Sequence, residues 1–100
     1  MTWKPISEAE LASQIRDAAS ELNGADGKKF ASIQTSPHRI PCKRNAQTPN
    51  EEIFVVAQAG SRVLVFDDVE DEFGVGDLAE SPVLEKWDLL GSLSNALVRF

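Results

Sequence analysis

A chain of 100 residues that are 42% hydrophobic and 26% charged has the size and composition of one globular domain, which we expect to span 1–100. This composition excludes disorder of the whole chain, and the longest unbroken apolar run, 53–57, is too short to cross a membrane. The only cysteine, Cys42, excludes an internal disulfide and favours a reducing compartment, so we expect a cytoplasmic protein.

The net charge of −6 is unevenly distributed along the chain. Residues 1–50 carry seven Lys and Arg against five Asp and Glu, whereas residues 51–100 carry three against eleven. An acid-rich surface repels nucleic acid and attracts basic partners. We therefore expect a basic protein partner and no nucleic acid.

The N-terminal segment predicts a helix over about 8–22. Ser7 and Glu10 have the spacing of a capping box, in which each side chain accepts from the other residue's backbone N–H. Asn23-Gly24 supplies residues that tolerate a left-handed helix end. Apolar residues recur at helical spacing, namely Leu11, Ile15, Ala18, Ala19 and Leu22.

The next segment predicts strands and turns. Asp26-Gly27 is typical of a turn, residues 29–36 favour a strand, and Ser36-Pro37 is expected to end it. A short strand over 39–43 follows, with Ile40 and Cys42 pointing inward. Pro41 lacks the N–H that a ladder needs, which places this strand at a sheet edge. Residues 43–50 are polar and predict a loop.

Two continuous apolar runs predict the centre of the protein, as a hairpin of strands 52–58 and 62–67. Both runs are rich in β-branched and aromatic residues, which is typical of strands covered on both faces. Residues 58–61 between them predict a tight turn in which Gly60 takes a positive φ.

The last third begins with the acidic run 67–72, and residues 73–76 predict a further short strand. From Val83 two alternatives stay open. One is a helical face that continues to Phe100, and the other, which we prefer, is a strand over 83–89 and a terminal helix capped by Ser92. Gly91 disfavours the first alternative, because a glycine inside a helix costs about 1 kcal/mol relative to alanine.

These elements predict an α+β fold. It consists of an N-terminal helix, a central antiparallel or mixed β-sheet that contains the 52–58/62–67 hairpin, a C-terminal helix, and helices on one face. The connections between strands are mostly too short for parallel crossovers.

The acidic run is the main candidate site, and we read it as a partner-binding surface. Its carboxylates would steer a basic partner toward the protein, and a neighbouring phenylalanine would supply an apolar anchor. The calcium-loop pattern fails, because Phe73 stands where glycine is required. We expect no metal site, and the partner-binding residues are Asp67, Asp68, Glu70, Asp71, Glu72, Phe73 and Asp77.

Other motifs do not reach the requirements of a site. His38 and Cys42 supply only two of the four ligands of a structural zinc site, and no signature supports a catalytic dyad. Residues 74–76 lack the third glycine of a phosphate-binding loop and favour a bulge or twist in a strand. We therefore expect no cofactor and no catalytic residue.

The C-terminal part resembles small bacterial proteins, some of which are similar to toxin-immunity proteins. The resemblance rests on Val63-Leu64-Val65-Phe66, the acidic run, Phe73-Gly74-Val75-Gly76, Trp87, Gly91-Ser92-Leu93 and Ala96-Leu97. It implies a compact non-enzymatic protein that binds and neutralises a basic toxin.

Three functional hypotheses follow. The first is a non-enzymatic protein-binding module that resembles an immunity protein. The second is a small ligand-binding domain or enzyme with a cleft beside the sheet. The third is a structural subunit of a homo-oligomer, and the sequence leaves a monomer and a homodimer open.

Overall fold

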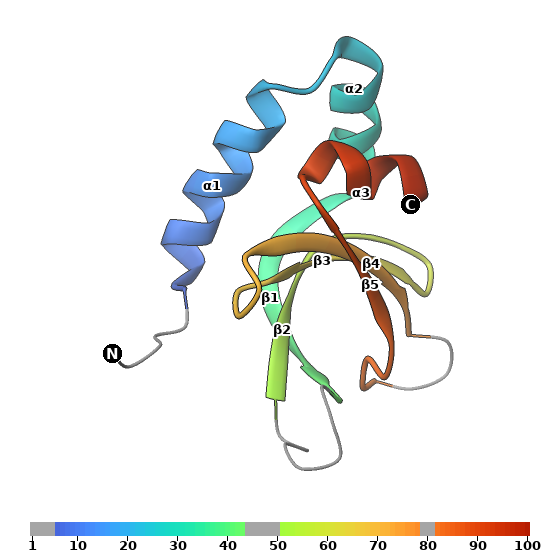
Figure 1. Cartoon of the computed structure of the whole chain (residues 1–100). Coiled ribbons are helices and arrows are strands. Elements are labelled where there is room, and N and C mark those ends of the chain that lie inside the picture. Colours follow the sequence, from blue (N-terminus) through green and yellow to red (C-terminus); the bar gives the residue numbers. More distant parts are fainter. Residues whose placement is uncertain (1–5, 44–50, 79–81) are drawn as a thin grey trace.

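The computed structural model describes residues 6–43, 51–78 and 82–100. These residues form three helices and five strands, which confirms the α+β class (Figure 1). In chain order the elements are α1 (Glu8–Ser20), α2 (Gly24–Ile33), β1 (Gln34–Cys42), β2 (Glu51–Ala59), β3 (Arg62–Asp67), β4 (Glu72–Asp77), β5 (Trp87–Gly91) and α3 (Leu93–Arg99).

The first helix is the one that its capping box predicts. The Glu10 amide donates to Ser7 Oγ across 3.1 Å, and the Ser7 amide donates to Glu10 Oε1 across 3.4 Å. Leu11 and Ile15 are the buried residues of the helix. α1 ends at Ser20, two residues before the predicted end.

The strand expected over 29–36 is wrong for most of its length, because α2 occupies Gly24–Ile33. Asn23 does not end α1 in a left-handed turn. It is the N-cap of α2, and its Oδ1 accepts from the Asp26 amide at 2.8 Å. Asp26-Gly27 lies inside the helix and is not a turn. The helix is held by burial of Phe30, which is 2% exposed in the core.

β1 begins earlier than expected and continues through Pro37, so the predicted break at Ser36-Pro37 is wrong. The register of β1 against β2 is irregular between Gln34 and His38, and this irregularity accommodates Pro37. Pro41 lies in β1, at one edge of the sheet, as expected. Cys42 is buried and Ile40 is partly buried. The predicted loop 43–50 lies outside the described residues except for Lys43.

The strands form one antiparallel sheet in the order β1-β2-β3-β4-β5, each paired with its neighbours in sequence. The predicted hairpin is confirmed as β2 and β3, and Gly60 in its turn has φ 62°. A register shift between Val55 and Ala57 lets Val56 and Ala57 face the same core cluster.

Both faces of the central strands are buried, as the continuous apolar runs predicted. One face packs against residues of all three helices, among them Leu11, Phe30 and Leu97. Figure 1 shows the helices gathered on that side. The other face forms a second cluster with Val55 and Val65.

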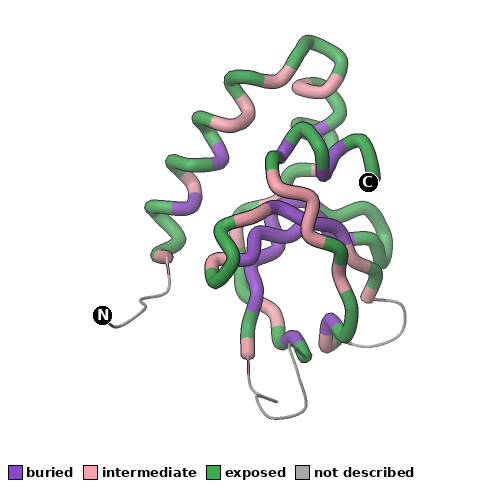
Figure 2. The backbone as a smooth tube through the Cα atoms, viewed as in Figure 1, coloured by how far each residue is buried: buried purple, intermediate pink, exposed green. Residues whose placement is uncertain are grey.

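The sheet curls so that its two ends meet around this second cluster. The Leu84 amide donates to Pro41 O, and the Lys43 amide donates to Leu84 O, each across 2.9 Å. Figure 2 shows the resulting ring of backbone, with buried segments on its wall. Leu84 therefore closes the sheet against the edge of β1.

Two glycines of β4 allow this curvature. A Cβ on Gly74 would overlap the carbonyl oxygen of Asp88, and a Cβ on Gly76 would lie 2.8 Å from Leu84 Cδ1. The register of β4 and β5 also shifts between Phe73 and Gly74. The predicted strand 73–76 and its irregularity are therefore confirmed.

The C-terminal segment follows the preferred alternative with shifted bounds. The strand is Trp87–Gly91, not 83–89, and Ser92 caps α3 by accepting from the Asn95 amide at 3.2 Å. Gly91 has φ 85°, a backbone conformation that excludes the continuous helix.

Candidate functional site

The acidic run forms the turn between β3 and β4, and we call residues 68–72 the acidic turn. Its conformation follows from the sequence. Asp71 has φ 58°, a left-handed conformation that aspartate tolerates better than most residues. The turn lies at one end of the β3–β4 hairpin, and Asp77 lies at the opposite end, paired with Arg62.

Asp67 belongs to the interior of the protein and not to a contact surface. Its side chain is fully buried, at 0% exposed. Oδ1 accepts from the amides of Val69 at 3.0 Å and Glu70 at 3.3 Å, and Oδ2 accepts from Trp87 Nε1 at 3.4 Å. Because hydrogen bonds to a buried carboxylate are strong, Asp67 fixes the start of the acidic turn from inside.

Phe73 is also interior, so it cannot be the apolar anchor that the sequence suggested. It is 7% exposed and packs edge-on against Phe66, with ring centroids 5.0 Å apart. The apolar residue that the turn does expose is Val69, which is 42% exposed. Val69 carries no signal of a contact residue in the sequence, because it stands alone among acidic residues.

Asp68 connects the acidic turn to the N-terminal segment. Its Oδ2 accepts from the Ile6 amide at 3.2 Å, while Arg39 Nη2 donates to the Ile6 carbonyl at 3.1 Å. The Arg39 guanidinium also lies 4.5 Å from the ring centroid of Phe54. One basic residue of β1 is therefore brought near the acidic turn, and both charges serve to hold Ile6.

The remaining carboxylates of the turn point to solvent or lie partly exposed. Glu70 and Asp71 are exposed and Glu72 is half-buried. Within the part of the chain that the structure describes, these three residues make no ion pair, and the recorded ion pair joins Lys43 to Glu85 across 3.3 Å. The turn therefore presents three consecutive carboxylates on a fixed backbone.

The other candidates of the sequence are not assembled into a site. His38 is exposed, with Nδ1 2.9 Å from Ser36 O, whereas Cys42 is buried. Among residues 6–43, 51–78 and 82–100, no group of three or more His, Cys, Asp or Glu has the arrangement of a metal site. Among the basic residues, Lys29 makes a contact within the protein, because its Nζ donates to Leu97 O across 2.7 Å.

Comparisons with known proteins give no relative: no family model, no curated protein and no solved structure matches this chain. No helix among the described residues has both the length and the apolar character that a membrane span requires.

Proposed function

We propose that this chain is a non-enzymatic binding module whose acidic turn docks a basic protein, in the manner of a toxin-immunity protein. The observation that carries the proposal is the run of three consecutive carboxylates, Glu70, Asp71 and Glu72, that make no ion pair within the described structure. Clustered charge of one sign raises the association rate of an oppositely charged partner.

The frame of the turn supports this role. Asp67 bonds two backbone amides of the turn from the interior, so the carboxylates are displayed on a backbone that is already ordered. A preorganised loop loses less conformational entropy on binding than a flexible loop does. Val69 adds an exposed apolar contact in the middle of the charges.

The immunity-like role and the cytoplasmic location are parts of the same proposal. They rest on the resemblance of residues 62–100 and on the single cysteine.

The test compares proteins retained by three immobilised forms of the chain at low and at high salt. The turn variant carries Glu70→Lys, Asp71→Asn and Glu72→Lys, where asparagine keeps the left-handed backbone at position 71. The matched control carries Asp17→Asn, Glu21→Lys and Glu52→Lys, three exposed residues of α1, its C-cap and β2, and has the same net charge.

We expect a basic protein that is retained by the wild type and the control at low salt, released at high salt and absent from the turn variant. Equal retention by the turn variant and the control would refute the proposal, since charge at the turn would then have no special role.

A further inference from the structure

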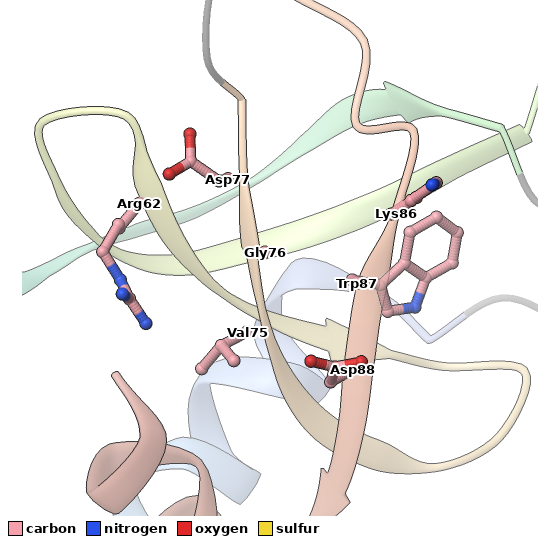
Figure 3. A pocket seen from close by; sticks show the side chains of 7 residues that line it. All are labelled: Arg62, Val75, Gly76, Asp77, Lys86, Trp87 and Asp88. Atoms are coloured by element: carbon pink, nitrogen blue, oxygen red, sulfur yellow. The ribbon is translucent and has the colours of Figure 1, made fainter.

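A depression of about 350 Å³ lies at the opposite end of the β3–β4 hairpin from the acidic turn. It spans three neighbouring strands, with Arg62 on β3, Val75 on β4 and Asp88 on β5 (Figure 3). Arg62 pairs in register with Asp77, and Val75 pairs with Asp88. Because alternate residues of a strand share a face, these four side chains belong to one face of the sheet.

The depression carries both signs of charge around an apolar residue. Figure 3 shows Arg62 and Asp88 on opposite sides of Val75. Lys86 lines the depression as well, on the Asp88 side. In the described part of the chain, no ion pair joins Asp88 to Arg62 or to Lys86. Asp88 therefore lines the same depression as Arg62 without forming an ion pair with it. Asp77, which stands in register with Arg62, lines the depression as well.

The C-terminal segment holds the Arg62 side chain in place. Arg62 Nη2 donates to Arg99 O across 2.7 Å, and its guanidinium lies 5.5 Å from the ring centroid of Phe100. A guanidinium has five N–H donors, so this bond leaves others for a ligand. An arginine that is already positioned loses less side-chain entropy when it binds a carboxylate.

We propose that this depression binds a small zwitterion, with its ammonium group at Asp88, its carboxylate at Arg62 and an apolar stretch over Val75. Neighbouring strands lie about 4.8 Å apart, so the backbones of β3 and β5 are separated by roughly 10 Å. The two charges of the ligand are therefore better separated by a short alkyl chain than by the single carbon of an α-amino acid. This site is independent of the proposed function, since it uses no residue of the acidic turn.

The experiment titrates the full chain with 6-aminohexanoate and follows backbone amide signals by two-dimensional NMR. Glycine tests the required length, and hexylamine and hexanoate each carry one of the two charges. The main variant is Asp88→Asn, an exposed residue, and the control is Asp17→Asn on α1. A second variant, Arg62→Gln, removes the cation, and its spectrum reports whether α3 stays in place.

We expect saturable shifts around Val75 and Asp88 with 6-aminohexanoate, and affinities at least tenfold weaker for glycine, hexylamine and hexanoate. Asp88→Asn weakens binding of 6-aminohexanoate at least tenfold, and Asp17→Asn leaves it unchanged. Arg62→Gln abolishes the preference for 6-aminohexanoate over hexylamine. The absence of saturable shifts at tens of millimolar ligand would overturn the proposal, as would equal binding of the singly charged compounds.

Discussion

The indole nitrogen of Trp87 donates a hydrogen bond to Oδ2 of Asp67 across 3.4 Å, and this contact joins β5 to the start of the acidic turn. The other oxygen of the same carboxylate accepts two backbone amides of that turn. One buried side chain thus connects two segments that lie 20 residues apart. The conformation of the proposed contact surface therefore depends on the interior of the protein.

Replacing Asp67 should destabilise the protein more than any other change in the acidic run. Asp67→Ala leaves buried N–H groups without their acceptor, and we expect a loss of about 3 kcal/mol in the free energy of unfolding. Asp67→Asn keeps one carbonyl oxygen as an acceptor and should cost less. Urea denaturation measures both, and Asp71→Asn, an exposed change, is the control.

The contribution of Trp87 is separated by a double-mutant cycle with Trp87→Phe and Asp67→Ala, because alanine removes the acceptor that asparagine would keep. A direct hydrogen bond predicts a coupling energy of about 1 kcal/mol between the two positions. Additive effects would contradict the contact, and an Asp67→Ala variant as stable as the wild type would contradict its structural role.

Gly74 and Gly27 lie in opposite environments, one against the backbone of β5 and the other in open space. Gly74→Ala should be strongly destabilising, by about 3 kcal/mol or more, because its Cβ would overlap the Asp88 carbonyl oxygen. Gly27→Ala is the matched control. No atom lies within 4 Å of a Cβ on Gly27, and the residue is inside α2, so alanine should stabilise the protein by about 0.5–1 kcal/mol. Thermal unfolding of both variants checks the sign, and equal effects would refute the close approach of β5 to β4.

The sequence predicted those elements whose local signals agree with the tertiary structure. The capping box of Ser7 and Glu10 predicted α1, and the apolar runs predicted β2 and β3 with burial on both faces. The helix α2 was missed because asparagine, aspartate and glycine serve helix N-caps and turns alike. Burial of Phe30, a tertiary contact, decides between the two.

The burial of the individual residues of the acidic run could be predicted only in part from the sequence. The acidic run appears uniform in sequence, yet Asp67 is buried and Glu70 is exposed. The sequence did carry one signal of this burial. Alternate residues of a strand share a face, so Asp67 lies on the same face as Val63 and Val65, which point inward. The closure of the sheet by Leu84 has no such local signal, because it depends on the curvature of the whole sheet.

Asp68 should hold the start of α1 against the acidic turn, in addition to any effect it has on partner binding. Asp68→Asn weakens the charge-assisted bond to the Ile6 amide, and we expect faster amide hydrogen exchange at the start of α1. Glu70→Gln removes an exposed charge two residues away and should leave that exchange unchanged. Identical exchange in both variants would show that the Ile6 contact does not hold the N-terminal segment.

Val69 should influence the lifetime of a complex more than its rate of formation. Val69→Ser removes the exposed apolar contact and keeps every carboxylate, so we expect a dissociation rate that rises about three- to tenfold with the association rate unchanged. Val98→Ser, on the exposed side of α3, is the control. Surface plasmon resonance with the retained basic protein measures both rates, and equal dissociation rates for the two variants would exclude Val69 from the interface.

If the acidic turn steers a basic partner, the charge of the turn sets the rate at which the two proteins associate. Stopped-flow measurement compares the wild type, the turn variant and the matched charge control against the same retained protein at increasing salt. We expect an association rate at least tenfold lower for the turn variant at low salt, and equal association rates of the three forms at high salt. Equal rates for the turn variant and the control at low salt would contradict it.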